Sequence, residues 1–276
     1  MEDYKGMIID CKSSSVVLVI TGCISPIKDQ AHLVLKDVDE RIRQYLKSIK
    51  YYIEDTDFYN IVFCENSAYE LEERFELEKD AEALGKHLEW LSFNGNLTEE
   101  AKYSNKGIGE DEIMDYIFNN SQLIQNAKTF VKVTGRLILN NINSIIKYAH
   151  YGSNYFYRDL YGNVNHGVDT RFYVVDTSYY KNCLRNCYTK TDDKEMRYED
   201  AFYVLMDGKY ELFPIYPRFH GSSSGNGKIY DDEGETKLKF LDLMCRLRWY
   251  NKYYSFIYYY FKIIRKFKGW RNLLLQ

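Results

Sequence analysis

The sequence predicts an α/β fold with a mostly parallel, Rossmann-like central sheet flanked by helices. Apolar runs rich in β-branched residues alternate with helix-like segments over the first 140 residues, which is the pattern of repeated βαβ units. The first of these runs is apolar without alternation, as expected for a strand buried on both faces of a parallel sheet. With 276 residues, of which 45% are hydrophobic and 28% are charged, the chain can bury a substantial core.

The alternation can be followed along the chain. "SSVVLVITGCI" (14–24) predicts a strand, and "DVDERIRQYLKSIKYYI" predicts a helix capped by Asp37 or Asp39, because its aliphatic residues recur at helical spacing. "FYNIVFCENS" predicts the next strand, "YELEERFELEKDAEALGKH" a charged helix and "LEWLSF" a short strand. "GEDEIMDYIFNNSQLI" predicts a helix that leads into "FVKVTGRLIL" (130–139), which we expect to be one buried strand.

The second half is less regular. "DTRFYVVDTSYY" resembles a strand, "KNCLRNCY" and "RYEDAFYVLMD" resemble helices, and "KYELFPIYPRF" reads as extended chain before the Gly/Ser-rich loop "HGSSSGNGKIY". From about Lys237 the pattern predicts one or two basic, aromatic helices. We therefore expect a main domain over 1–236 and a basic C-terminal extension over 237–276.

Several classes of protein lack support in the sequence. There is no run of eighteen apolar residues and no basic-then-apolar amino terminus, so we expect a cytoplasmic protein. The six cysteines form no CxxC cluster and the five histidines show no metal spacing. No GxGxxG, GK[ST] or GxSxG motif is present, so dinucleotide binding, ATP hydrolysis and acyl transfer have no motif behind them.

Charge is unevenly spread along the chain. Residues 243–276 carry eight Lys or Arg and no acid, whereas the first 242 residues carry 29 basic and 40 acidic side chains. Basic helices with aromatic borders bind anionic membrane surfaces, which makes the tail a candidate for peripheral membrane contact. A packing helix with solvated charges is the alternative. The acidic body argues against a nucleic-acid partner.

Polar groups stand where several predicted strands end. They are Thr21-Gly22, Glu65-Asn66-Ser67, and Lys132 with Gly135-Arg136. Ligands of open α/β sheets bind beyond the carboxyl ends of the strands, so these positions are the first candidates for a site.

The order of these segments resembles the bacterial GT-A glycosyltransferases that build capsule and lipopolysaccharide. The resemblance covers about 14–220 and is carried by the apolar strand, "FCENS", "KGIGE" opening a helix, the strand at 130–139, "VDTRFY" and the later "YED". It implies a GT-A-like catalytic domain, a nucleotide-sugar donor and a lipid-linked glycan acceptor at the inner face of the plasma membrane.

One position departs from that family. The fourth strand of GT-A enzymes normally ends in an Asp-x-Asp motif that holds a divalent cation against the donor's diphosphate, whereas this chain has Lys132 and Arg136 there. Two fixed cations can neutralise the leaving diphosphate where a metal does not. No metal is therefore favoured, although Asp169 with Asp176 or a remote acid leaves Mg²⁺ or Mn²⁺ open. A plain ion pair at the strand end is the alternative for Lys132 and Arg136.

The resemblance also implies roles for the other candidates, each of which has a structural alternative. Glu199, with Asp200 second, would be the catalytic base, or both would be acids at a helix start. Asp169 and Arg171 would position substrate, or form a salt bridge. Glu110 of "KGIGEDE" would also position substrate, or be a first-turn acid of a capping loop. The donor would be held by the polar strand ends and by Lys106, or these would be helix caps and a capping loop; the donor candidates are Thr21, Gly22, Glu65, Asn66, Ser67, Lys106, Lys132, Gly135 and Arg136.

We therefore expect a glycosyltransferase that moves a sugar from a nucleotide donor, with UDP-sugars the first choice, to a hydroxyl of a surface polysaccharide. A sugar nucleotidyltransferase is one alternative, although "TGCISPIKDQ" is a poor match to the glycine-rich basic signature that it needs. A noncatalytic adaptor bound to the membrane through its tail is another. The donor sugar, linkage, anomeric outcome and oligomeric state have no signal in the sequence.

Overall fold

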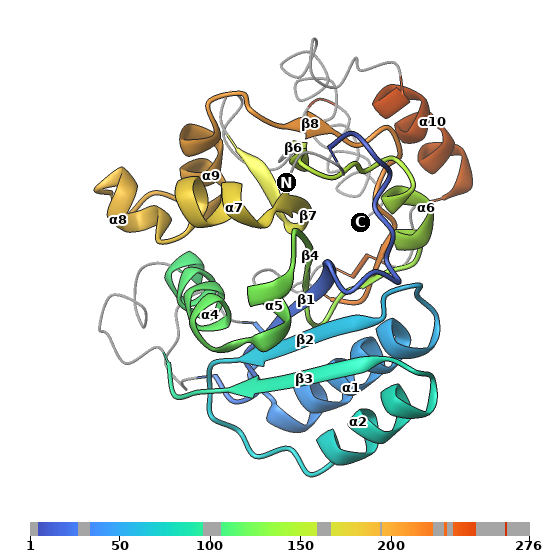
Figure 1. Cartoon of the computed structure of the whole chain (residues 1–276), viewed down its shortest axis with the longest axis vertical. Helices are drawn as coiled ribbons and strands as arrows, with labels where there is room; N and C mark the ends of the chain where they lie inside the picture. Colours follow the sequence, from blue (N-terminus) through green and yellow to red (C-terminus); the bar gives the residue numbers. More distant parts are fainter. Residues whose placement is uncertain are drawn as a thin grey trace, which may run out of the picture.

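The computed structural model describes residues 5–26, 34–95, 106–158, 167–193, 195–222, 229–230, 234–246 and Ile263. These residues form a seven-stranded sheet with helices on both faces (Figure 1). The strands of this sheet are β1 (Val16–Gly22), β2 (Asn60–Glu65), β3 (His87–Ser92), β4 (Thr129–Thr134), β6 (Tyr155–Arg158), β7 (Val168–Asp176) and β8 (Glu211–Leu212). A two-stranded sheet pairs β5 (Ile138–Leu139) with β9 (Phe219–His220).

The order of the large sheet is β3-β2-β1-β4-β7-β6-β8, and β7 alone runs against the other six strands. The predicted α/β class with a mostly parallel sheet is therefore confirmed. The reversal of β7 pairs Phe172 with Val133, so the first residues of β7 lie beside the last residues of β4. Side chains that are almost 40 residues apart in the sequence thus meet at one edge of the sheet.

Helices cover each face of the sheet in two groups (Figure 1). The first group is α1 (Val38–Glu54), α2 (Arg74–Ala83), α6 (Ile142–Ile146) and α10 (Glu235–Arg246). The second is α4 (Lys106–Asn120), α5 (Gln122–Asn126), α7 (Thr177–Tyr179), the π-helical turn η1 (Tyr180–Leu184), α8 (Cys187–Thr191) and α9 (Tyr198–Met206). Each face has its own apolar core, because alternate residues of β1 and β4 point to opposite sides.

The predicted cap of the first helix is confirmed. The Asp37 side chain accepts a hydrogen bond from the Glu40 backbone N–H at 2.7 Å, and α1 starts at the next residue, Val38. The same helix buries Tyr45, Ile49, Tyr52 and Ile53 against the sheet. Burying these side chains removes a large apolar area from water and fixes α1 against the strands.

Three predicted boundaries are wrong. Residues 130–139 do not form one strand, because the chain turns after Thr134 and re-enters as β5. The charged helix is shorter than its sequence segment, and His87 already belongs to β3. "KGIGE" is not a capping loop: both of its glycines lie in the first turn of α4, where the packed helix overrides the low helix propensity of glycine.

The C-terminal extension is described only in part. α10 begins at Glu235, and its Asp242 accepts hydrogen bonds from the Tyr216 backbone N–H at 2.9 Å and from Arg218 at 2.8 Å. The basic tail beyond Arg246 lies outside the described residues, apart from Ile263, so the division at residue 236 and the membrane contact remain predictions. None of the described helices combines the length and the apolar composition that crossing a bilayer requires.

Asp111 of α4 generates a prediction about stability. Its carboxylate accepts a hydrogen bond from the Cys187 backbone N–H at 3.4 Å, and burial raises its pKa from 3.8 to about 6. A raised carboxyl pKa means that the ionised form costs folding free energy above pH 6, and that this cost disappears as the pH falls toward 4. We expect Asp111→Asn to stabilise the protein at pH 7.5 by up to about 3 kcal/mol and to give no benefit at pH 4.

Thermal unfolding at the two pH values measures this effect. The control is Asp80→Asn, because Asp80 is an exposed acid of α2. This substitution should change the stability by the same amount at both pH values. An Asp111→Asn variant that loses more stability at pH 7.5 than at pH 4 would contradict the assignment of the cost to the buried charge.

Candidate functional site

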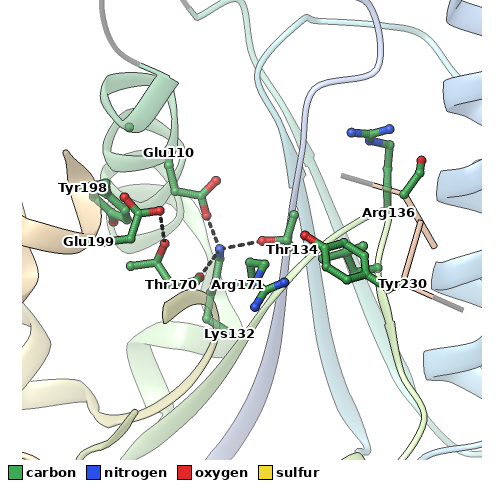
Figure 2. A pocket seen from close by; sticks show the side chains of 12 residues that line it. Glu110, Lys132, Thr134, Arg136, Thr170, Arg171, Tyr198, Glu199 and Tyr230 are labelled. Carbon is green, nitrogen blue, oxygen red and sulfur yellow. Dashed lines mark hydrogen bonds and ion pairs between the residues drawn. The ribbon is translucent and has the colours of Figure 1, made fainter. Parts of the chain in front are cut away.

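A pocket opens at the carboxyl end of β4, beside the point where the strand order reverses from β1-β2-β3 to β1-β4 (Figure 2). The lining residues are Gly107, Glu110, Lys132, Thr134, Arg136, Leu137, Thr170, Arg171, Tyr198, Glu199, Ser222 and Tyr230. Glu110 and Glu199 lie in the amino-terminal parts of α4 and α9. Those helix ends add a positive potential to the pocket, because helix dipoles point their positive ends this way.

Lys132 lies at the centre of the pocket floor and is only 1% exposed. Its ammonium contacts Glu110 Oε1 at 2.5 Å, the Thr170 carbonyl at 2.8 Å and Thr134 Oγ1 at 3.2 Å. A lysine ammonium has three N–H donors, so these three acceptors fill its hydrogen-bonding capacity. Lys132 thus forms the ion pair that was its structural alternative, and its charge is balanced within the protein.

The positive charge of Arg171 is also balanced by a carboxylate, that of Asp169. Its Nε donates to both Asp169 oxygens, at 2.9 and 3.1 Å, and a second guanidinium nitrogen contacts the same carboxylate. The guanidinium also lies over the rings of Phe219 and Tyr230, 4.5 and 5.1 Å from their centroids. Burial alone would lower the pKa of Arg171, but the attraction and hydrogen bonds of Asp169 outweigh it and raise the pKa. The Asp169–Arg171 salt bridge therefore lies within β7, and the guanidinium that it holds contacts the segment that carries Phe219.

Arg136 is different from the other two cations. It is 6% exposed, and its Nη1 donates to Gln44 Oε1 at 2.9 Å, a neutral amide of α1. Among the described residues, no carboxylate lies within 4 Å of its guanidinium. Burial lowers the pKa of Arg136, the opposite direction to Arg171. Arginine stays protonated in proteins, so the pocket contains a buried positive charge whose described partner is uncharged.

The two candidate bases are separated by the helix geometry of α9. Glu199 lines the pocket, and Thr170 Oγ1 donates to its Oε1 at 3.4 Å. Asp200 is not part of the lining, and Arg197 binds both of its oxygens, at 2.7 and 2.8 Å. Neighbouring residues on a helix diverge by about 100°, which is why only Glu199 faces the pocket.

Figure 2 shows how the groups are distributed. Glu199 and Thr170 lie on one side of the Lys132–Glu110 pair, and Arg136 lies with Tyr230 on the other. The carboxylate and the cation without a described carboxylate are therefore at opposite ends of the pocket, with a neutralised floor between them.

Thr21 and Gly135 support the pocket without lining it, and Gly22 packs against Phe63 and Tyr45 outside the lining. Thr21 Oγ1 donates to Glu110 Oε1 at 2.9 Å, and the Gly135 backbone N–H donates to the Thr21 carbonyl at 2.8 Å. A Cβ at Gly135 would lie 2.5 Å from the Thr21 carbonyl oxygen and 2.9 Å from the Tyr45 ring. Only glycine allows the turn after β4 to pack this closely on β1.

Glu65, Asn66 and Ser67 form a separate cluster at the end of β2. Glu65 is fully buried and accepts hydrogen bonds from the backbone N–H groups of Ser67 and Tyr69, both at 3.0 Å, and from the side chain of Ser92. Glu65 therefore organises its own loop. Asn66 is 3% exposed and its Oδ1 has no partner in the described structure, so it keeps an acceptor for a ligand or a water.

Several lining residues carried no usable signal in the sequence. Ser222 and Tyr230 come from the Gly/Ser-rich segment, about 90 residues after β4, and Gln44 is one of many polar residues on α1. Thr170 and Tyr198 stand next to candidates, in "VDTRFY" and "RYED", and adjacency is the one clue that pointed to them. The side chain of Lys106 lies outside the described residues, although its neighbour Gly107 lines the pocket.

The carboxylates of the pocket do not form a metal cage. Glu110 forms an ion pair with Lys132, and Asp169 forms one with Arg171. The described residues contain no group of three or more His, Cys, Asp or Glu that can hold a metal ion.

No family profile matches the sequence, and no curated protein matches it. Solved structures with a similar arrangement include the glycosyltransferase GlyE of Streptococcus pneumoniae TIGR4, with 10% identity, a TM-score of 0.47 and coverage of 72% of this chain and 44% of that chain. The chain thus spans less than half the length of GlyE.

Two other solved structures are HddC from Yersinia pseudotuberculosis (12% identity, TM-score 0.40, 75% of this chain and 93% of that one) and the inositol-1-phosphate CTP transferase of T. maritima (12%, 0.41, 86% and 98%). Likenesses at this level assign neither a family nor a reaction.

The Lys132–Glu110 pair generates a prediction. Removing one partner leaves a buried charge uncompensated, so we expect Glu110→Ala to destabilise the fold by about 2–4 kcal/mol. Adding Lys132→Met should recover much of that loss, because the unpaired charge is then gone. Chemical denaturation measures both variants. Lys239→Ala, which breaks the exposed Glu235–Lys239 pair, is the control and should change stability far less. A double variant as unstable as Glu110→Ala would show that the charge is not the cause.

Proposed function

We propose that this protein is a glycosyltransferase that moves a sugar from a nucleotide-sugar donor, with a UDP-sugar as first choice, to a hydroxyl of a lipid-linked surface glycan. The observation that carries the proposal is the buried Arg136 guanidinium with a neutral partner, in the same pocket as the carboxylate of Glu199. Burying a cation without a carboxylate is costly, and an anionic ligand repays that cost. The diphosphate of a nucleotide sugar is such an anion.

The arrangement in Figure 2 fits a direct displacement. Glu199 takes the proton from the acceptor hydroxyl while the oxygen of that hydroxyl forms a bond to the anomeric carbon. The bond from that carbon to the phosphate oxygen breaks, and its electron pair leaves with the nucleoside diphosphate, which gains one negative charge. Arg136 stabilises that charge from the far end of the pocket. The sugar lies between them, over the neutral Lys132–Glu110 pair.

The remaining candidates take supporting roles in this proposal. Lys132 orders the floor through Glu110 and Thr134, and its positive charge is a secondary contribution. Asn66, with its unpartnered Oδ1, contacts the nucleoside, and Glu65 shapes the loop that presents it. Arg171 holds the Tyr230 ring at the pocket wall, where a sugar can stack.

The acceptor side of the proposal rests on the chain beyond α10. The basic, aromatic tail would hold the enzyme at the cytoplasmic face of the membrane, where lipid-linked capsule or lipopolysaccharide precursors are extended. That placement comes from the composition of residues 243–276.

The proposal is tested by donor turnover. We expect the purified chain to release nucleoside diphosphate from a nucleotide sugar, and Arg136→Ala to lower kcat/KM for the donor by about 10²–10³-fold. Arg136→Lys should recover only part, since lysine cannot bind two phosphate oxygens at once. Release of pyrophosphate from a nucleoside triphosphate and a sugar phosphate would instead establish the nucleotidyltransferase alternative. Turnover of neither substrate would contradict both enzymatic functions and support the noncatalytic adaptor.

The base is tested separately. We expect Glu199→Gln to lower kcat by about 10²–10⁴-fold and to remove the fall in rate at low pH, because the amide cannot take a proton. Asp200→Asn should cost much less, since the Asp200 carboxylate is held by Arg197 outside the pocket lining. Equal losses in both variants, measured with matched stabilities, would exclude Glu199 as the sole base.

A further inference from the structure

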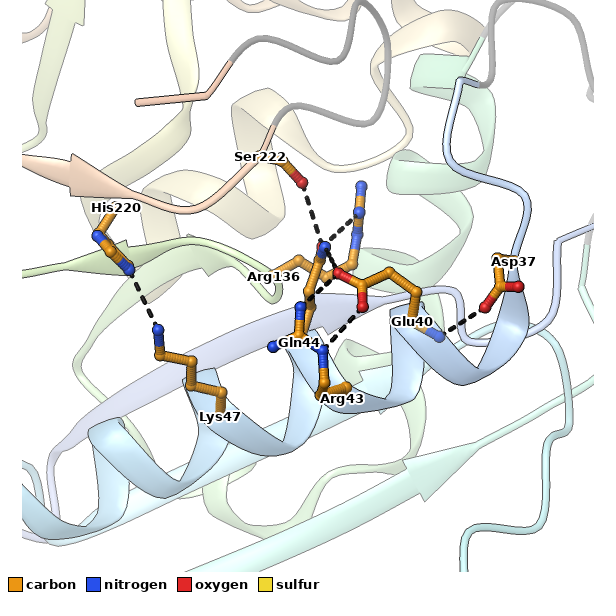
Figure 3. Close-up of polar contacts among 8 residues, drawn as sticks. All are labelled: Asp37, Glu40, Arg43, Gln44, Lys47, Arg136, His220 and Ser222. Carbon is orange, nitrogen blue, oxygen red and sulfur yellow. Dashed lines mark hydrogen bonds and ion pairs between the residues drawn. The ribbon is translucent and has the colours of Figure 1, made fainter. Parts of the chain in front are cut away.

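Gln44 stands between Arg136 and a charged group on the surface of α1 (Figure 3). Its Nε2 donates to Glu40 Oε1 at 2.6 Å. Glu40 is itself held by Arg43, whose Nε and Nη2 lie 2.8 and 2.6 Å from its two oxygens. These bonds, from Arg43 first and Gln44 next, lower the pKa of Glu40 to about 2, so its carboxylate is ionised at neutral pH.

The neighbours of Gln44 fix the orientation of its amide. The NH₂ group faces a carboxylate, which can only accept, and the oxygen faces a guanidinium, which can only donate. A flipped amide would oppose donor to donor and acceptor to acceptor. The negative charge of Glu40 also polarises the amide, which strengthens Oε1 as an acceptor for Arg136.

The second lone pair of the same oxygen is used as well. Ser222 Oγ donates to Gln44 Oε1 at 3.2 Å, and Ser222 lines the pocket. Gln44 therefore fixes two parts of the pocket wall at once, one from the turn after β4 and one from the segment that follows β9.

The three cations among the described lining residues differ in how their charge is balanced. Lys132 is paired with Glu110 and Arg171 with Asp169, whereas Arg136 is held by an amide that orients it and leaves its charge intact. The nearest carboxylate along this chain of contacts, Glu40, lies one helical turn before Gln44 and is already bound by Arg43. A glutamate at position 44 would make the same hydrogen bond and cancel the charge.

We propose that Gln44 is a positioning residue, whose neutral amide holds Arg136 for a phosphate-bearing ligand without neutralising it. The ligand class follows from the proposed function, but the inference itself requires only that Arg136 binds a diphosphate group. Exchanging Glu40 and Gln44 tests it, since Glu40→Gln with Gln44→Glu keeps the composition and net charge and moves one carboxylate a single helical turn toward Arg136.

The measurement is calorimetric binding of inorganic pyrophosphate and of UDP to the full chain, with Tm recorded for every variant. We expect the exchange to weaken binding of both probes at least tenfold and to make the remaining binding less sensitive to salt. Gln44→Glu alone should do the same and serves if the exchange variant does not fold. In an Arg136→Ala background the exchange should have no further effect, because the residue that it acts through is gone.

The matched control is the exchange of Lys50 and Glu54, an exposed pair with the same spacing on the same helix. It should leave binding unchanged. Wild-type binding of the two probes by the Glu40/Gln44 exchange variant, or an equal loss with and without Arg136, overturns the inference. Failure of the wild-type protein to bind pyrophosphate and UDP also overturns it. Pyrophosphate binding that responds to the exchange, in a protein that transfers no sugar, supports the inference and rejects the proposed function.

Discussion

The cost of burying positive charge governs the structure around the pocket. Three cations lie at one edge of the sheet, and a cation removed from water must find an anion, a set of hydrogen-bond acceptors, or a ligand. Lys132 and Arg171 obtain carboxylates from α4 and from β7 itself. Arg136 receives neutral groups from α1, the Gln44 amide oxygen and the Tyr45 side chain. All three cations find their partners because α1, α4 and β7 surround the end of β4.

The antiparallel strand β7 is the architectural element that joins them. Because it runs against β4, its first residues bring Thr170 and Arg171 to the edge where β4 ends, and Thr170 contacts both Lys132 and Glu199. A parallel β7 would place those residues at the opposite edge. The pocket thus depends on one reversal in an otherwise parallel sheet.

Sequence patterns predicted the fold class, the alternation of strands and helices and the Asp37 cap, because each depends on residues close together in the chain. The ends of the predicted strands indicated where the pocket lies, because the carboxyl ends of parallel strands meet at one edge of the sheet. The partners of the polar residues were not predictable. Glu110 precedes Lys132 by 22 residues and Gln44 precedes Arg136 by 92, and no local pattern links either pair. The break after β4 depends on a backbone contact between Gly135 and Thr21, which has no sequence signature.

The pocket has two walls that differ in how freely their residues can be substituted. The wall at Gly135 is the constrained one. A side chain there would collide with the Thr21 carbonyl of β1 and the Tyr45 ring, so the backbone next to Arg136 stays packed against β1 and α1. Ser222 and Tyr230 come instead from a surface segment, where substitutions and insertions are tolerated. Homologous chains that bind different ligands should therefore diverge along this outer wall, while the anchoring glycine stays the same.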